Sequence, residues 1–223
     1  MGEWQGYRLE DLLMFTPEVY FRLFERYNGM VWPGHLVAFS VAIWMFVGTR
    51  DSGPRQSRWI AGVLGAVWLF IAWAFFLRYY AEVFLAAPWF AAGFALQGLL
   101  LVVAGGSGRL RFAWRVDAVA GVGITLLLYS ALGHPLVGIF AGRDWNGVEL
   151  FLLAPDPTAI GTLGLLLMSS GRNHWVLAVV PLLWCLISGA TSWVMGAYSG
   201  LGIPLAAVVA LASMACRSLG PCR

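Results

Sequence analysis

Two imidazoles and two carboxylates occur where long apolar segments of this chain begin or end. His35 begins the first such segment, His134 lies in the later half of the fourth, and Glu149 and Asp156 precede the fifth. Imidazole and carboxylate groups bind divalent cations and relay protons, and ionisable groups within a membrane are costly and usually functional. Tyr129 lies about one helical turn before His134. We therefore predict a ligand-binding site made by these five residues, with a metal ion held by His35, His134 and Asp156.

The spacing of these residues does not by itself define a site. No two of them stand at a ligand interval on one helix, and a histidine at the end of a span is more often hydrated or bonded to a carbonyl group. A haem between His35 and His134 would require equal depth of both side chains, and no other feature supports one. All 14 basic residues are arginine, which excludes a Schiff base with retinal or pyridoxal phosphate and the lysine of a phosphate-binding loop.

The composition places these residues in a membrane protein. Of the 223 residues, 60% are hydrophobic and 11% are charged, whereas soluble domains are roughly 45–50% apolar and about 25% charged. An aromatic content of 15% excludes a disordered chain, and three cysteines are too few for a disulfide scaffold. The arginines are scattered between apolar runs, so we expect the lipid bilayer as a partner and no nucleic acid.

Uncharged stretches that are long enough to cross about 30 Å of hydrocarbon indicate the membrane spans. Six are clear, and a weaker stretch, Pro157–Gly171, makes seven. The six are Tyr27–Thr49, Trp59–Leu77, Val83–Gly108, Ala118–Gly142, and two helices within Asn173–Cys216 that are joined by a turn at 196–200. We predict an all-α polytopic transmembrane bundle of about seven spans, and a six-span chain is the alternative.

The distribution of charge favours seven spans with the N-terminus outside and the C-terminus inside. Cytoplasmic loops are enriched in arginine. In this arrangement most arginines lie inside, namely Arg50, Arg55, Arg58, Arg109, Arg111, Arg115, Arg172, Arg217 and Arg223. The only acidic residues inside are Asp51 and Asp117. Six spans would place Arg172 and the C-terminal arginines outside, so we predict a multi-pass protein of the bacterial inner membrane with seven spans.

The N-terminal region predicts an amphipathic helix at the membrane surface. Thr16 and Pro17 are typical of a cap and a first-turn proline, and they open a helix that runs to Asn28. Apolar residues occupy one face of this helix and charged residues the other, as in helices that lie in the membrane interface. The chain then divides into a tail and interfacial helix (1–28), a transmembrane bundle (29–216) and a cytoplasmic tail (217–223).

The fifth span is too short to cross a membrane alone. A helix from Pro157 to about Ser169 is about 20 Å long, which leaves about 10 Å of the hydrocarbon to be crossed by another structure. We expect Asp156 to cap this helix at the positive end of its dipole. The preceding apolar stretch 148–155 either dips into the membrane and opens an outward-facing cavity, or residues 143–156 lie on the surface.

Several short motifs point to a known family. The most specific is Ala-Pro-x-Pro-Thr at residues 154–158. The others are Tyr27-Asn28 with Trp32-Pro33, Gly133-His134-Pro135-Leu136-Val137-Gly138, Leu163-Gly164-Leu165-Leu166-Leu167 and Pro181-Leu182-Leu183-Trp184. Together they resemble an uncharacterised bacterial family of multi-pass membrane proteins, a domain of unknown function, over nearly the whole chain. The resemblance implies membrane class and the importance of residues 154–158, and it implies no activity or substrate.

These observations lead to two functional hypotheses. The first is a small transporter or binder of a cation or small solute, which enters through an outward-facing cavity. The alternative is a non-catalytic accessory subunit that docks its apolar faces onto a larger membrane complex or a second copy of itself. An enzyme comes third, because the sequence contains no nucleophile elbow, phosphate loop or zinc-protease motif.

Overall fold

The long apolar runs fold into helices because, in an apolar environment, only a helix satisfies its own backbone hydrogen bonds within one segment. The computed structural model describes residues 16–50, 53–113, 117–170 and 174–219. Its helices are α1 (Pro17–Val31), α2 (Gly34–Gly48), α3 (Pro54–Ile71), α4 (Ala87–Gly106), α5 (Ala118–Leu128), α6 (His134–Phe140), α7 (Pro155–Met168), α8 (His174–Val194) and α9 (Gly202–Leu219). Two π-helical turns, Ala72–Leu77 and Tyr129–Gly133, continue α3 and join α5 to α6. Short 3-10 turns cover Tyr80–Glu82, Trp145–Gly147 and Tyr198–Leu201, and the strands β1 (Arg111–Phe112) and β2 (Ser169–Ser170) pair antiparallel.

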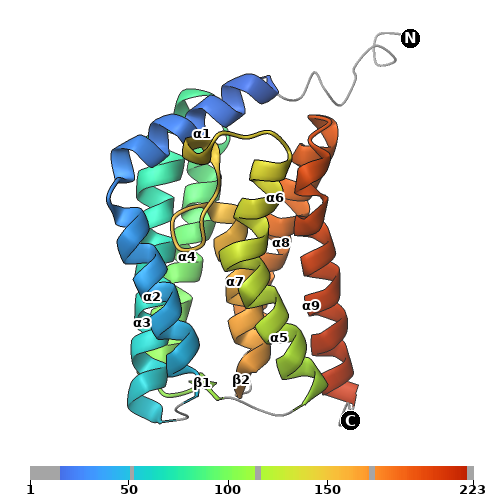
Figure 1. Ribbon diagram of the computed structural model, residues 1–223. Coiled ribbons are helices and arrows are strands. Elements are labelled where there is room, and N and C mark those ends of the chain that lie inside the picture. The colour runs from blue at the N-terminus through green and yellow to red at the C-terminus, as the bar shows by residue number, and fades with distance from the viewer. Residues whose placement is uncertain (1–15, 51–52, 114–116, 171–173, 220–223) are drawn as a thin grey trace, which may run out of the picture.

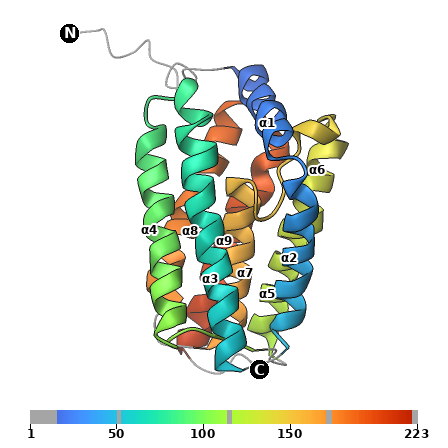
Figure 2. The same ribbon diagram turned by 90° about the vertical axis from the view of Figure 1, so that its left-hand side faces the viewer.

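Most of these helices run side by side along one axis, and α1 lies across one end of them (Figures 1 and 2). We call this end the outer end, following the predicted orientation, and the end with β1 and β2 the inner end. Glycines allow the closest helix pairs to approach. A Cβ atom on Gly65 of α3 would lie 2.7 Å from the carbonyl oxygen of Gly98 in α4, and one on Gly123 of α5 would lie 2.7 Å from that of Gly164 in α7. Small residues at such crossings are typical of helix packing in membranes.

The described residues include five helical segments that are long and apolar enough to cross a membrane. They are Pro54–Glu82, Ala87–Gly106, Ala118–Phe140, Trp175–Val194 and Tyr198–Leu219. A sixth is added if α1 and α2, which meet at an angle of 86°, are counted together. The remaining segment of the seven-span prediction is α7, whose 14 residues are too few for this criterion.

Helix α1 covers the outer end of the bundle with an apolar face. It begins at Pro17, as predicted, but continues to Val31, and Thr16 makes no side-chain cap bond. Tyr20, Leu23, Phe24 and Tyr27 on this helix are buried, whereas Glu18, Arg22 and Glu25 are exposed. The charged face of α1 therefore points away from the bundle. Its placement in a membrane interface stays a prediction.

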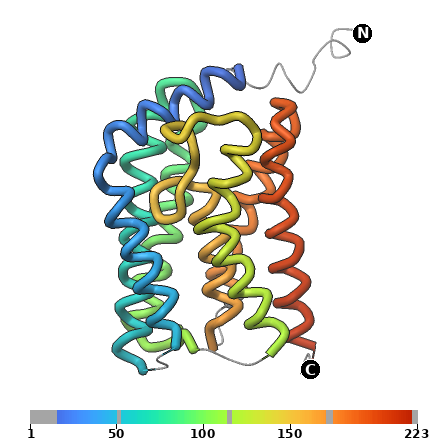
Figure 3. The backbone as a smooth tube through the Cα atoms, viewed as in Figure 1, coloured from blue at the N-terminus to red at the C-terminus, as the bar shows by residue number. Residues whose placement is uncertain are grey.

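Helix α7 begins part-way down the bundle, below a loop that descends from the outer end (Figure 3). All 14 residues of α7 are buried, and so are residues 147–149 and 151–154 of the loop. The alternative in which residues 143–156 lie on the surface is therefore wrong for the part of the segment that leads into the helix. At the inner end, Arg217 of α9 donates to the carbonyl oxygens of Leu167 (2.6 Å) and Ser169 (3.2 Å), which closes the C-terminus of α7.

Candidate functional site

Three of the predicted site residues meet at the point where the loop passes into α7. One ligand atom from each of His134, Glu149 and Asp156 lies within 4.8 Å of the other two. The three residues are 6%, 3% and 3% exposed, respectively. The Nε2 atom of His134 and the Oε2 atom of Glu149 are 3.7 Å apart, which is too long for a hydrogen bond. A cation with bonds of about 2.0–2.2 Å would fit between such atoms after a small inward movement of the side chains.

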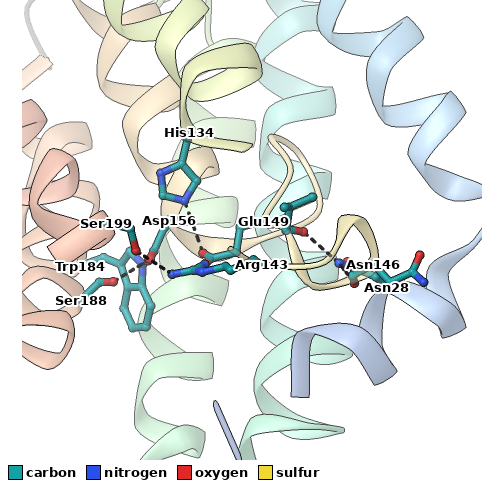
Figure 4. Close-up of polar contacts among 10 residues, drawn as sticks. Asn28, His134, Arg143, Asn146, Glu149, Asp156, Trp184, Ser188 and Ser199 are labelled. Carbon is teal, nitrogen blue, oxygen red and sulfur yellow. Dashed lines mark hydrogen bonds and ion pairs between the residues drawn. The ribbon is translucent and has the colours of Figure 1, made fainter. Parts of the chain in front are cut away.

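A break in helix geometry positions His134. The π-helical turn Tyr129–Gly133 separates α5 from α6, and His134 is the first residue of α6, directly before Pro135. Proline removes one backbone donor, and π-helical turns inside helices occur frequently at functional sites. The break turns the imidazole of His134 toward the loop that carries Glu149 (Figure 4).

Asp156 is held by donors from α8. Its Oδ1 atom accepts a hydrogen bond from Nε1 of Trp184 and its Oδ2 atom accepts one from the hydroxyl of Ser188, both at 2.7 Å (Figure 4). The predicted capping role of Asp156 is wrong, because α7 begins at Pro155, Ala154 is its N-cap and no side chain caps the helix. Asp156 still lies in the first turn, where the helix dipole favours a negative charge. Each carboxylate oxygen has a further lone pair, so both hydrogen bonds are compatible with metal ligation.

The loop before α7 is held by side chains from α1 and α7. The backbone N–H of Leu152, which has a positive φ of 70°, donates to the hydroxyl of Thr158 at 3.0 Å. The hydroxyl of Tyr27 donates to the carbonyl oxygen of Leu153 at 2.8 Å. The amide of Asn28 donates to the carbonyl oxygens of Asn146 and Val148 at 2.7 and 2.9 Å. The Tyr27-Asn28 and Ala-Pro-x-Pro-Thr motifs therefore meet at this loop and fix its path.

Arg143 joins Glu149 to the outer end of the bundle. Its Nη1 atom donates to Oε1 of Glu149 at 2.9 Å, and its Nη2 atom donates to the hydroxyl of Ser199 at 3.3 Å. The guanidinium also lies over the ring of Phe21 in α1, 4.2 Å from the centroid. Glu149 belongs to the loop, outside the long apolar helices. Burial raises the pKa of its carboxyl group, but the neighbouring His134 and Arg143 outweigh burial, and the net effect lowers the pKa.

Within the part of the chain that the structure describes, two buried polar atoms of the cluster have no hydrogen-bond partner. They are Nδ1 of His134 and Oε2 of Glu149. Buried polar atoms in proteins are almost always bonded, so each exception calls for an explanation such as an ion or a water molecule. An imidazole nitrogen and a free carboxylate oxygen beside a second carboxylate form a donor set that suits divalent transition metals such as Zn²⁺ or Mn²⁺.

An open cavity of about 560 Å³ lies above this cluster at the outer end. It is bounded by α1, by the start of the loop after α6 and by the turn between α8 and α9. Its lining includes Glu18, Glu25, Arg143, Asp144 and Ser199. Arg143 is both a wall of this cavity and a partner of Glu149, so it stands between the cavity and the three buried ligands.

The remaining two predicted site residues are not among the three clustered ligands, although Tyr129 lies beside one of them. Tyr129 is half-buried, with its ring 6.2 Å from that of His134, and its hydroxyl packs against Gly202 of α9. His35 lies at the start of α2, with its ring 5.7 Å from that of Trp32, and its buried Nδ1 atom has no hydrogen-bond partner. The structure does not bring His35 into the group of three ligands, so metal ligation by His35 stays a prediction.

Three residues that complete the site were missing from the predicted set. Trp184 and Ser188 stand four residues apart in an apolar span, and this helical interval would have placed both on one face. No comparable spacing points to Arg143, which reaches Glu149 because the loop folds back on itself.

The described residues form an all-helical fold with five to six segments that are long and apolar enough to cross a membrane, and a buried cluster of one imidazole and two carboxylates that is a candidate cation site. No curated protein and no solved structure matches the chain. The chain belongs to a family of unknown function, DUF6064, whose sequence profile matches residues 17–221. The resemblance to an uncharacterised family is therefore confirmed, while the bacterial origin and the 154–158 motif stay predictions.

Proposed function

We propose that this protein is an integral membrane protein that binds a divalent transition-metal cation and takes it up from the outer side of a bacterial inner membrane. The observation that carries the proposal is the convergence of His134, Glu149 and Asp156 in a buried position, with two of their polar atoms lacking partners. Burying two carboxylates costs free energy that opposite charge must offset. A bound dication supplies that charge, and the neighbouring Arg143 supplies only part of it.

A carrier role follows from where the cluster lies. The ligands lie below the outer cavity and at the N-terminus of a short helix that begins part-way down the bundle (Figure 1). Half-helices that present their N-termini inside a bundle are a common element of transporter sites. Toward the inner end, the cluster is followed by α7, whose residues are all buried and whose C-terminus is bonded by Arg217. We therefore propose no passage from the cluster to the inner end. We propose seven spans with α7 as the short one, the N-terminus outside and the cation site open to the outer side.

The competing function is a non-catalytic accessory subunit of a larger membrane complex or of a homo-oligomer. Such a subunit would keep its partners through purification and would not respond to cations. It offers no role for an unpaired carboxylate oxygen that lies beside an imidazole and a second carboxylate deep inside one chain, whereas cation binding uses all three groups. The cluster therefore favours cation binding.

Thermal unfolding in detergent tests the proposal. Zn²⁺, Mn²⁺ or Co²⁺ at about 100 times its Kd should stabilise the unaltered protein by about 2.7 kcal/mol. Asp156→Asn should abolish this stabilisation, and without added metal it should unfold at the same or a higher temperature, because the amide removes one buried charge.

Asp117→Asn is the matched control, since Asp117 caps α5 at the inner end through a 2.7 Å bond to the N–H of Ala120 and lies far from the cluster. This variant should keep the full response to metal. An equal response in the Asp156→Asn protein would show that the cation binds elsewhere, and no response in the unaltered protein would overturn the proposed function.

A further inference from the structure

Arg143 makes contacts with three separate parts of the molecule. It donates to Glu149 in the loop before α7 and to Ser199 in the turn between α8 and α9, and it lies over Phe21 of α1. A charge-assisted bond to a carboxylate is about twice as strong as a neutral one, and an arginine cation gains further from an aromatic face. The guanidinium is therefore firmly held, although Arg143 follows the left-handed Gly142 in a loop at the protein surface.

The position of Arg143 coincides with the route into the cluster. The side chain lines the outer cavity, and its Nη1 atom bonds the Oε1 atom of Glu149, whose Oε2 atom faces His134. A cation that enters from the cavity meets the guanidinium before it reaches Glu149. Because the two positive charges repel each other and share one carboxylate, the incoming ion and Arg143 compete for Glu149.

The charges around this point favour such an exchange. Glu149 and Asp156 are the two acidic side chains of the cluster, and Arg143 is in contact with the first only. On the cavity side, Glu18, Glu25 and Asp144 offer carboxylates near which a displaced guanidinium is stabilised. The guanidinium of Arg143 therefore has a carboxylate partner in both states: Glu149 before a cation binds, and the carboxylates of the cavity after it binds.

We propose that Arg143 is the outer gate of the cation site and a residue that determines its selectivity. This inference rests on the proposed function. In the absence of a dication the guanidinium serves as a tethered counter-ion of Glu149. A cation binds only by displacing this guanidinium toward the cavity. A monovalent ion carries no more charge than the guanidinium and lacks its directed hydrogen bonds, so it does not displace Arg143. A dication carries twice the charge and gains coordination bonds from all three ligands, so it does.

Mn²⁺ titration followed by electron paramagnetic resonance tests the gate, because the six-line signal reports free Mn²⁺. Arg143→Gln removes the competing charge and should bind Mn²⁺ about tenfold or more tighter, as expected from the loss of one charge-assisted bond that the ion must break. In this variant K⁺ should compete with Mn²⁺ more strongly than the bulky N-methylglucamine cation does at equal ionic strength. The unaltered protein should not distinguish these two cations.

Two variants serve as controls. Arg143→Lys keeps a tethered positive charge but loses the planar guanidinium that bonds two partners and lies over Phe21, so its affinity for Mn²⁺ should lie between those of the unaltered protein and Arg143→Gln. Arg26→Gln removes an arginine from another arginine–glutamate pair, the exposed bond of 3.0 Å to Glu82, and should change nothing.

A second measurement uses the native arginine. Because Arg143 donates to the hydroxyl of Ser199, its displacement should uncover this position. Ser199→Cys should therefore react several-fold faster with a charged thiol reagent when Mn²⁺ is bound, as read by mass spectrometry of the labelled peptide. An unchanged or slower reaction contradicts displacement, even if Arg143→Gln does not fold.

The outcomes separate the gate from the function. If Asp156→Asn abolishes Mn²⁺ binding while Arg143→Gln binds with unchanged or lower affinity, the gate is wrong and the cation site stands. If Arg143→Gln binds Mn²⁺ and the unaltered protein does not, the gate is supported in its strongest form. If neither protein binds Mn²⁺ or any other transition-metal dication, both proposals fall.

Discussion

Asp156 illustrates how single side chains build this site. A carboxylate that is 3% exposed loses most of its hydration, and the donors from Trp184 and Ser188 replace part of it. These bonds also fix the orientation of the carboxylate, in the way that outer groups orient metal ligands in known sites. The indole of Trp184 further packs edge-on against Phe76, Phe90 and Phe94. Trp184 therefore combines packing with the orientation of a proposed ligand.

Replacing Trp184 with phenylalanine separates these two roles. Trp184→Phe keeps most of the aromatic contact and removes the N–H donor, so we expect a loss of about 1.5–3 kcal/mol in the free energy of unfolding and weaker cation binding. Chemical denaturation in detergent with and without metal measures both effects. Trp89→Phe is the control, because Trp89 is 80% exposed. An equal loss in both variants would show that Trp184 contributes only as an aromatic residue.

The loop from 141 to 154 and helix α7 form the element that brings the ligands together. From residue 147 onward the loop is mostly buried and has little regular structure, which is tolerated only where protein groups satisfy its backbone. Thr158 satisfies the N–H of Leu152, and the hydroxyl of Tyr27 and the amide of Asn28 satisfy carbonyl oxygens of the loop. This explains why a threonine follows the second proline of the 154–158 motif.

The bond from Leu152 to Thr158 can be removed with little change of shape. Thr158→Val leaves the buried N–H of Leu152 without an acceptor, so we expect a loss of about 1–3 kcal/mol in stability. Hydrogen exchange of residues 147–154 should become faster. Thr125→Val is matched to it, since Thr125 is exposed on α5 and bonds only within its own helix. Unchanged exchange in the Thr158→Val protein would mean that the loop is held by α1 alone.

The two ends of the helical bundle differ, because one carries the candidate site and the other carries the paired strands β1 and β2. The candidate cluster and its cavity lie toward the end covered by α1, and the strands β1 and β2 lie at the other end (Figure 1), where Arg217 bonds the carbonyl oxygen of Ser169 in β2. Among the described residues, Arg50 after α2 and Arg109 and Arg111 after α4 belong to connections at this inner end, which agrees with the proposed orientation.

Thiol labelling in intact cells checks this orientation. Ala141→Cys, exposed after α6, should react with a membrane-impermeant reagent, because the proposed orientation directs the outer end away from the cytoplasm. Ser107→Cys, at the end of α4, should react only after the membrane is made permeable. The reverse labelling pattern would show that the proposed orientation is wrong and that the cavity faces the cytoplasm.

The sequence predicted the helices better than the site, for a physical reason. Helix limits follow from local apolar runs and breakers, so α4 and α9 lie where uncharged gaps predicted spans, and the short α7 followed from the prolines around Asp156. The contacts of Asp156 depend on which face of α8 turns inward, and those of Arg143 on the path of an irregular loop. The spacing of residues in the sequence predicts neither set of contacts. Spacing also does not show which helix a neighbour packs on. His35 was expected beside His134, but it lies on α2, which packs mainly on α3, and its ring is next to that of Trp32.

X-ray absorption spectroscopy of the zinc-loaded protein, with the zinc content measured on the same sample, decides whether the cluster is a metal site, because it identifies the ligands of the bound ion. We expect one Zn²⁺ per chain with oxygen and nitrogen ligands at about 2.0–2.2 Å, one imidazole and no sulfur, and the loss of this ion in a His134→Ala protein. Sulfur ligands, two or more imidazoles, or a spectrum unaffected by His134→Ala would contradict it.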